Sequence, residues 1–282
     1  MASGDQILVR TISTASVVDS RGHAWNYHSR SDHHSKVACW GIVFDLLRAS
    51  RTFRRHAAEG RVCFGINHEM RDFRNDRKKN LDLVICQPAG DRSADGRTLS
   101  CLAAKYKIAL TPAEASELAA LPPLQEAPVG TVLVALEAKA CMTAHQKALP
   151  RLYDELNSSH LTVHGAHDLA IAAGFIAINA APRFLSPSRN APFDADRLIW
   201  NQHKQPKCIE ITTEKVRQLP RRSKPGENGY DALAITVIDC VNDGSPVSLS
   251  TDEPAPQPKD TYYYGSMIDR LQGLYETRFA QF

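Results

Sequence analysis

The stretch VLVALEAKACMTAH (residues 132–145) decides how the fold of this chain is predicted. Its first five residues are apolar, which is typical of a strand buried on both faces of a sheet. Glu137 and Lys139 follow, two residues apart. Because residues two apart on a strand point to the same face, these side chains should project together. Burying an acid and a base costs free energy unless they are paired or bind an ion. The stretch therefore predicts a central strand (131–139) that carries a polar site at its end.

The patterns on either side of this strand predict an α/β protein. Thr111, Pro112 and Glu114 supply the N-cap, the first position and the capping box of one helix. Pro150 fits the first turn of a later helix better than its interior. Residues 169–179 fit a buried strand, or a helix that runs into one. The expected helices are 37–58, 111–121, 148–160 and a C-terminal one from 262, and the other expected strands are 61–67, 80–86 and 231–241. This order favours a central mixed β-sheet flanked by helices over a regular strand–helix alternation.

The remaining segments are more polar. Residues 1–36 contain short strand-like runs, QILVRTI (6–12) and ASVVDS (15–20). Residues 87–98 are rich in Gly, Asp and Pro and are expected to form a loop. Residues 248–261 are rich in Pro and are expected to be a linker or surface loop.

Size and composition indicate a globular protein with a substantial core. The chain has 282 residues, of which 43% are hydrophobic and 23% are charged, so one elaborated domain or two small ones are both compatible with its length. We see no apolar run of about 18 residues and no secretory pattern at the N-terminus, so we expect no membrane span and a cytoplasmic location. Seven scattered cysteines without a Cys-x-x-Cys pair favour reduced thiols over a disulfide framework.

The basic residues are concentrated in two segments, although the net charge is only +3. Residues 46–79 hold ten basic residues against four acids, and residues 214–224 hold five against one. Such clusters suggest a face that binds a polyanion. The alternative is an ordinary solvated surface.

A second strand adds a carboxylate to the polar site. Asp82 lies in the apolar run NLDLVIC (80–86). If this strand neighbours 131–139, then Asp82, Glu137 and Lys139 converge on one patch. Two carboxylates and a backbone carbonyl suit Mg²⁺. A lysine beside them can orient or help deprotonate a water and stabilise the charge on a phosphate, while the metal lowers the pKa of the water.

This arrangement resembles the PD-(D/E)xK nuclease superfamily, which has the restriction-endonuclease-like fold. The match consists of LD at 81–82 and EAK at 137–139, each in an apolar strand, with a helix after the second. The resemblance implies a helix, three strands, a helix and a strand over about residues 37–180, and so a single elaborated nuclease domain over 1–282. The C-terminal extension would be about 181–282.

The resemblance also assigns roles. Asp82 and Glu137 would be the metal ligands, Ala138 would lend its carbonyl, and Lys139 would be the catalytic base or the group that positions water. Two features depart from the family pattern. Leu81 stands where the family has proline, and Asp82 and Glu137 are 55 positions apart. The inserted helix at 111–121 could account for this longer separation.

Further residues could join the site. Some family members add an acid from the first helix, for which Asp45 and Glu59 are candidates, and Glu69 is another. His145 and Arg151 would lie near the phosphates at the start of the following helix, where backbone N–H groups also favour anions.

The implied function is a Mg²⁺-dependent endonuclease of double-stranded DNA, with Mn²⁺ as a substitute. It would act in restriction or in antiphage defence, where some members are switched on by a nucleotide second messenger. Cutting two strands with one site per chain favours a homodimer or another symmetric homo-oligomer. The alternative is a non-catalytic DNA-binding or assembly protein that keeps the fold.

Three other features each allow two interpretations. A histidine-rich start with Cys39 could bind zinc, although a flexible polar segment is favoured because the spacing fits no standard pattern. The run NSSH (157–160), with two later histidines, could contact DNA or merely end a helix, and the end of a helix is favoured. Residues 262–264 (YYY) could stack on bases, although packing at a subunit interface is favoured. The histidines concerned are His23, His28, His33, His34, His164 and His167.

Overall fold

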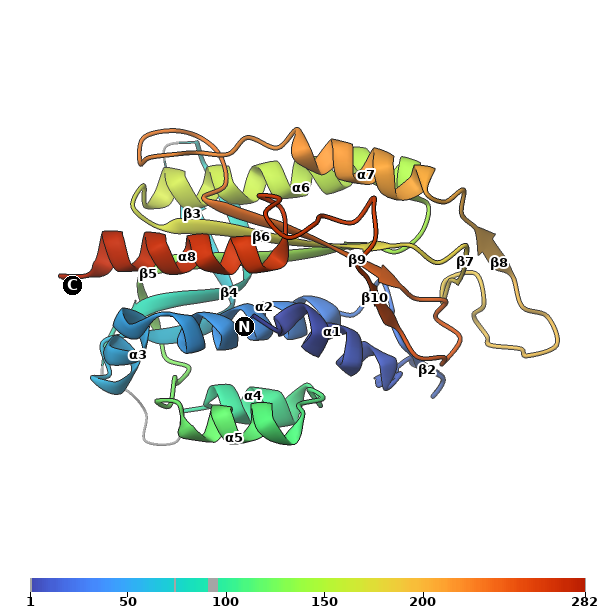
Figure 1. Cartoon of the computed structure of the whole chain (residues 1–282), viewed down its shortest axis with the longest axis horizontal. Coiled ribbons are helices and arrows are strands. Elements are labelled where there is room, and N and C mark those ends of the chain that lie inside the picture. Colours follow the sequence, from blue (N-terminus) through green and yellow to red (C-terminus); the bar gives the residue numbers. More distant parts are fainter. Residues whose placement is uncertain (1, 74, 91–95, 282) are drawn as a thin grey trace.

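A six-stranded mixed sheet forms the centre of the molecule (Figure 1). The computed structural model describes residues 2–73, 75–90 and 96–281. From one edge to the other the strand order is β10–β9–β6–β5–β4–β3. The strands are β3 (Cys63–Asp72), β4 (Arg77–Pro88), β5 (Val129–Cys141), β6 (Ile171–Asn179), β9 (Ala232–Asp239) and β10 (Ser248–Ser250). The predicted α/β class with a central mixed sheet is confirmed.

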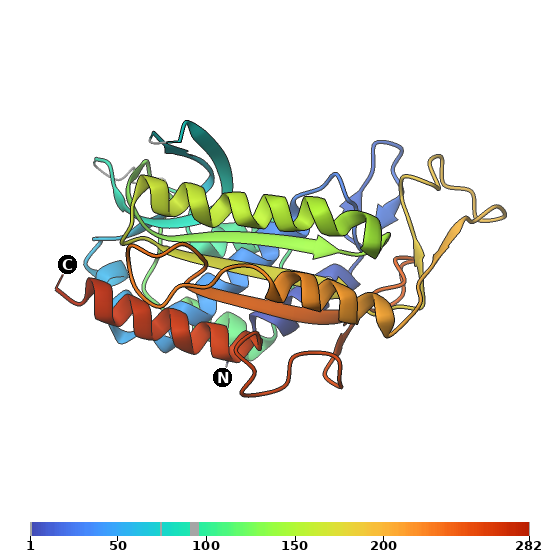
Figure 2. The same cartoon turned by 90° about the horizontal axis from the view of Figure 1, so that it is seen from above.

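Helices cover both faces of the sheet (Figures 1 and 2). One face is covered by α1 (Gly4–Ser13), α2 (His33–Ala49), α3 (Arg51–Ala58) and α8 (Tyr264–Phe279), and the other by α6 (His145–Ala166) and α7 (Lys207–Arg217). Outside α2 lie the short helices α4 (Leu99–Lys105) and α5 (Pro112–Ala120). Two small ribbons complete the fold, β1 (Val17–Val18) with β2 (Ala24–Trp25), and β7 (Arg183–Leu185) with β8 (Trp200–Gln202).

The helices and strands that surround the central strand β5 follow one another in the order expected from the sequence. β3, β4 and β5 form antiparallel pairs, and α6 then carries the chain back so that β6 lies parallel to β5. The expected insertion between the two site-bearing strands is present as α4 and α5, and the capping box of Thr111 and Glu114 is formed. The order α2–β3–β4–β5–α6–β6 is therefore observed.

The C-terminal part of the chain belongs to the same sheet. β9 pairs parallel to β6, and β10 pairs antiparallel to β9. The predicted Pro-rich linker at 248–261 therefore begins with a short edge strand. At the opposite edge, residues 125–127 run beside the start of β3, where Phe64 N–H donates to Gln125 O and Ala127 N–H donates to Phe64 O.

The N-terminal segment differs from its prediction. Residues 6–12, expected as strand-like, lie in helix α1. Ile7, Leu8 and Ile12 are buried on one side of it. Its start is capped from a distance, because Asp45 Oδ2 accepts hydrogen bonds from the N–H groups of Ser3 and Gly4. No local pattern could reveal that cap.

Other helix boundaries also needed correction. The helix predicted at 37–58 is broken at Ser50, whose extended backbone ends α2 and whose Oγ caps α3 through the N–H of Phe53. Helix α4 was not predicted. Helix α6 begins at His145, so Pro150 lies inside it rather than in its first turn. The run 157–160 lies within the same helix and does not end it. The loop predicted at 87–98 falls partly on residues 91–95, which lie outside the described residues.

No helix among the described residues is long and apolar enough to span a membrane. The strands instead bury their apolar side chains in two cores, one on each face of the sheet. Leu136 and Ala138 of β5 belong to the core under α2, and Ala135 belongs to the core under α6. β5 is therefore a central strand with apolar packing on both faces, as its sequence predicts.

Candidate active site

The two strands that carry the predicted site residues are neighbours. β4 and β5 pair antiparallel with Leu83 opposite Leu136, which places Asp82 opposite Glu137. The N–H of Ala138 donates to Asp82 Oδ2 at 3.0 Å. Lys139 Nζ lies 2.7 Å from Glu137 Oε1. The structure thus brings Asp82, Glu137, Ala138 and Lys139 together, which is the condition that the sequence left open.

Glu137 is the most deeply buried acid of this group. Its side chain is 3% exposed, and its Oε2 has no hydrogen-bond partner. Oε1 is held by Lys139 and lies 3.7 Å from Lys79 Nζ. Burial raises the pKa of Glu137, Lys139 opposes that rise, and the Asp82 carboxylate adds to it, so that the pKa lies above its ordinary value. This carboxylate therefore keeps one buried oxygen without a hydrogen-bond donor, while two lysines lie beside the other oxygen.

Asp82 is satisfied by contacts from α2. Lys36 Nζ lies 3.0 Å from Asp82 Oδ1 and also donates to the Asp82 backbone carbonyl, while Ser35 Oγ donates to Oδ1. Burial alone would raise the pKa of Asp82. The Lys36 ammonium, the Ala138 amide and Lys139 outweigh that effect and hold the pKa below its ordinary value. Asp82 is therefore ionised at neutral pH.

Lys139 is a protonated ammonium in this arrangement. Burial alone would lower its pKa, but Glu137, Asp82 and Glu155 outweigh burial and raise the pKa above the ordinary value. Its Nζ lies 3.6 Å from Glu155 Oε2, and its side chain is 26% exposed. Of the two roles that the resemblance offers, a charged lysine suits the positioning of water or phosphate better than proton abstraction.

A cavity of about 490 Å³ opens beside these residues. Asp82, Ala138 and Lys139 line its floor. Its rim includes Arg30 and His34 from the segment that leads into α2 and from its first turn, and Arg151 and Glu155 from α6. Arg151 is mostly exposed and pairs with Glu155 at 2.6 Å. The cavity therefore connects Asp82 and Lys139 to a rim that includes Arg30 and Arg151.

Comparison with known proteins adds nothing to this geometry. No family model, curated protein or solved structure matches the chain. The chemistry of the site must therefore be inferred from the residues themselves.

Several acids proposed as further ligands lie elsewhere. Asp45 caps α1 and accepts a hydrogen bond from the Tyr264 hydroxyl. Glu59 pairs with Arg61 at 3.4 Å, and Glu69 pairs with Lys78 at 3.1 Å. Among the described contacts, none of the three acids touches Asp82 or Glu137. These additions to the site are therefore not supported by the structure.

Several residues of the two basic segments form ion pairs within the protein. In the first, Arg48 pairs with Asp45 and Glu117, and Lys79 turns to Glu137; Arg74 lies outside the described residues. In the second, Arg222 is buried against Asp231 at 2.9 Å. Arg222 is thus a structural residue, because its charge is used inside the protein. Arg222 is therefore not available to the polyanion-binding face that the basic segments suggest, and for the other residues of these segments that face stays a prediction.

The remaining motifs are scattered. No group of three or more His, Cys, Asp or Glu side chains in the described part of the chain could hold a metal ion, so the N-terminal histidines do not gather with Cys39. His33 contacts the Tyr106 carbonyl, and His23 stacks on Phe193. Tyr262 and Tyr264 are buried within this chain rather than stacked as an exposed set. His145 lies in the wall of a different cavity from Arg151.

Three residues that contact the candidate site were not predicted from the sequence, namely Lys36, Lys79 and Glu155. Lys36 did carry a signal, because it is placed in the apolar stripe of α2 with Cys39, Trp40 and Val43 at helical spacing. A lysine in such a stripe requires a buried partner. Lys79 and Glu155 reach the site only through the pairing of β4 with β5 and the packing of α6, so no local pattern identifies them.

Proposed function

We propose that this protein is a metal-dependent endonuclease that hydrolyses phosphodiester bonds in double-stranded DNA. The observation that carries the proposal is the convergence of Asp82, Ala138 and Lys139 at the floor of one cavity, with the buried Glu137 carboxylate beside Lys139. The order α2–β3–β4–β5–α6–β6 is the one that the resemblance to PD-(D/E)xK nucleases implies, which supports the proposal.

The donor atoms fit a Mg²⁺ ion, with Mn²⁺ as its substitute. Glu137 offers an orphaned buried oxygen. In a strand, the N–H and C=O of one residue lie on the same edge, so the Ala138 carbonyl lies on the edge where its N–H meets Asp82. Asp82, Glu137 and that carbonyl would hold the ion. When bound, the metal lowers the pKa of a water and neutralises charge on the phosphate.

The chain's own residues supply the remaining chemistry. The Lys139 ammonium can donate hydrogen bonds to the attacking water and to a non-bridging phosphate oxygen, which orients both and stabilises the charge that develops. Arg151 and Arg30 on the rim can hold neighbouring phosphates of the strand. Lys36 fixes the Asp82 carboxylate in place.

The biological setting proposed for this activity is bacterial restriction or antiphage defence in the cytoplasm. Cutting both strands with one site per chain favours a homodimer or another symmetric assembly. Switching by a nucleotide second messenger is compatible with this role.

The decisive experiment is incubation of supercoiled plasmid with the protein in Mg²⁺ or in EDTA. Cleavage should require Mg²⁺ and fall by about 10²-fold or more in Lys139→Ala, the size typical for loss of one preorganised donor. Asp82→Asn should lose cleavage as well. Lys105→Gln, at an exposed lysine outside both basic segments, should cut like the wild type. Cleavage that persists in both site variants would exclude this site as the catalytic one.

A second candidate function is DNA binding without cleavage. The specific observation in its favour is that lysines already neutralise both carboxylates, since Lys36 holds Asp82 and Lys139 with Lys79 holds Glu137. In that case the lysines would replace a metal. Calorimetry with Mn²⁺ separates the two functions, because a catalytic site should bind the ion and lose that binding in Glu137→Gln.

A further inference from the structure

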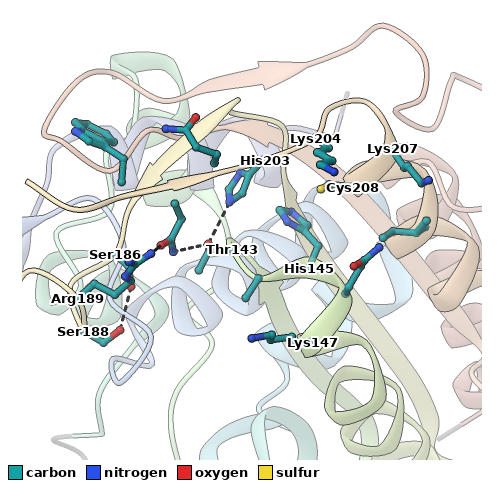
Figure 3. Close-up of a pocket in the computed structure, with 16 residues that line it drawn as sticks. Thr143, His145, Lys147, Ser186, Ser188, Arg189, His203, Lys204, Lys207 and Cys208 are labelled. Carbon is teal, nitrogen blue, oxygen red and sulfur yellow. Dashed lines mark hydrogen bonds between the residues drawn. The ribbon is translucent and has the colours of Figure 1, made fainter.

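A second cavity, of about 700 Å³, lies at the end of β5 (Figure 3). Its walls come from the first turn of α6, from the loop after β7, from β8 and from the first turn of α7. Thr143 lines both this cavity and the one above Asp82, so the two are adjacent. A volume of this size matches small-molecule sites, which commonly measure about 300–1,000 Å³.

The lining of this second cavity is strongly basic. Lys147, Arg189, Lys204 and Lys207 contribute to it, and no Asp or Glu does. Lys147, Lys204 and Lys207 are exposed, and they form no ion pair with any residue that the structure describes. An uncompensated group of this kind is a site for an anion.

The α6 N-terminus points its backbone donors at the same space. The N-cap residue Ala144 is in the left-handed region (φ 52°) and provides no side-chain cap. The N–H groups of His145, Gln146 and Lys147 therefore lack intrahelical acceptors, and all three residues line the cavity. The first turn of α6 contains no acid that could substitute for a bound anion.

A buried histidine in the wall also lacks a partner. His145 is 2% exposed, and its Nε2 lies 3.2 Å from the Asn179 carbonyl, to which it must donate. The Nδ1 atom is then left with a lone pair and no hydrogen bond. Burial, with His203 nearby, lowers the pKa of His145 to about 4, so the ring is neutral at pH 7. Nδ1 can therefore accept a hydrogen bond from a donor group on a ligand.

The neighbouring polar groups are already fixed. His203 Nδ1 donates to the Ala181 carbonyl, and the Thr143 hydroxyl donates to His203 Nε2 at 3.1 Å (Figure 3). The Asn201 amide in turn donates to Thr143 Oγ1 at 2.8 Å. This network holds one wall rigid, so that His145 and the lysines are the groups left for a ligand.

We propose that this cavity is a nucleotide-binding site. The lysines and the α6 amides would take a phosphate, His145 Nδ1 would accept a hydrogen bond from a sugar hydroxyl or base amino group, and Trp200 would offer a ring for the base. Arg183 already stacks on one face of that ring at 4.2 Å. An inorganic anion would pair with the lysines but would leave His145 Nδ1 and the Trp200 ring without partners. The nucleotide is either a free one or a unit of a nucleic-acid strand, and the site does not rest on the proposed nuclease activity.

The test is titration calorimetry in EDTA, which removes any metal-dependent step. The probes are AMP, ATP, a 5′-phosphorylated hexathymidylate and inorganic phosphate. A nucleotide probe should bind at least tenfold more tightly than inorganic phosphate. Preference for AMP or ATP would identify a free nucleotide, and preference for the hexathymidylate would identify a strand.

Variants then locate the binding. Lys204→Gln/Lys207→Gln should weaken nucleotide binding tenfold or more, because both lysines are exposed and folding should be unaffected. The matched double variant Lys105→Gln/Lys259→Gln, with exposed lysines outside this cavity and outside both basic segments, should bind like the wild type. Asp82→Asn should also bind normally, which separates this site from the proposed active site. Binding no tighter than that of inorganic phosphate, or equal in the two double variants, would overturn the proposal.

Discussion

At the scale of single residues, Asp82 and Glu137 show how two neighbouring carboxylates acquire different properties. Asp82 receives Lys36, Ser35 and a backbone amide, and its pKa falls. Glu137 keeps one orphaned oxygen, and its pKa rises. The difference arises from the distribution of donors around the two groups, since both are largely buried. Asp82 is thus an anchored anion, whereas Glu137 keeps one buried oxygen without a hydrogen-bond donor.

Replacing Lys36 should destabilise the protein. Lys36→Met removes a nearly buried ammonium and leaves the Asp82 carboxylate poorly compensated, so the free energy of unfolding should fall by about 3–5 kcal/mol. Urea denaturation at pH 7 measures this loss. The double variant Lys36→Met/Asp82→Asn should recover part of the stability, because the uncompensated charge is then gone. A single variant as stable as the wild type would show that the ion pair contributes nothing.

The ion pair between Lys36 and Asp82 makes the stability of the folded protein depend on pH. The pKa of Asp82 is lower in the folded protein than in the unfolded chain, so its contribution to stability is present above the unfolded pKa, about 3.9. The contribution is lost as the pH falls through the folded pKa. Thermal melts of the wild type and Asp82→Asn should therefore differ most at neutral pH and converge in strong acid.

Replacing Glu137 should raise the stability of the protein at neutral pH, whereas replacing Asp82 should lower it. The folded pKa of Glu137 is raised, so ionisation at neutral pH costs stability, and that cost grows as the pH rises from the unfolded pKa through the folded one. Glu137→Gln should therefore melt at a higher temperature than the wild type at pH 7 and at nearly the same temperature near pH 4. Nuclease activity should be lost in the same variant. A lower melting temperature at pH 7 would show that the pairs with Lys139 and Lys79 outweigh the burial.

At the scale of helices and strands, the elements with strong local signals were predictable. β5 and β9 have continuous apolar runs, and α5 carries its own capping box. The start of α1 was not predictable, because its cap comes from Asp45, about 40 positions away. The start of α6 at the left-handed Ala144 likewise depends on how the chain leaves the sheet. For the same reason, Lys79 and Glu155 could be found only in the packed fold, whereas EAK and the lysine at position 36 in an apolar helical stripe are visible in the sequence.

Helix α6 offers a test of its interior proline. Pro150 lies six positions after the N-cap, where it removes one helical hydrogen bond. Pro150→Ala should therefore raise the free energy of unfolding by roughly 1–3 kcal/mol in chemical denaturation. Pro112→Ala is the matched control, because Pro112 stands at the first turn of α5, where proline is favourable, and should give no gain. Equal effects of the two substitutions would contradict this explanation.

At the scale of the whole molecule, one buried network joins segments that are far apart in the sequence. Arg222 contacts Asp231 just before β9 and the backbone of Asp168 and Ala170 just before β6. Arg278 of α8 reaches the same Asp231 carboxylate at 2.6 Å. The segment predicted as a C-terminal extension is therefore tied into the central sheet.

This network predicts a single cooperative unfolding transition. Arg222→Met leaves Asp231 with less compensation and should lower the free energy of unfolding by about 3–5 kcal/mol. Lys224→Met, on the exposed loop nearby, should have little effect. Tryptophan fluorescence and far-ultraviolet circular dichroism should report the same midpoint. Two separate transitions would show that the extension unfolds independently of the core.

The edges of the central sheet restrict how two copies of this protein could associate. An unpaired strand edge invites β-strand addition by another chain, and short or charged edge strands oppose it. Here β10 is only three residues long at one edge. At the other edge, residues 125–127 cover the start of β3, and its far half alternates exposed Asn67, Glu69 and Arg71. Fusion of two sheets into one continuous sheet is therefore disfavoured, so a homodimer should form through helices or loops and remain resistant to fibrillar aggregation.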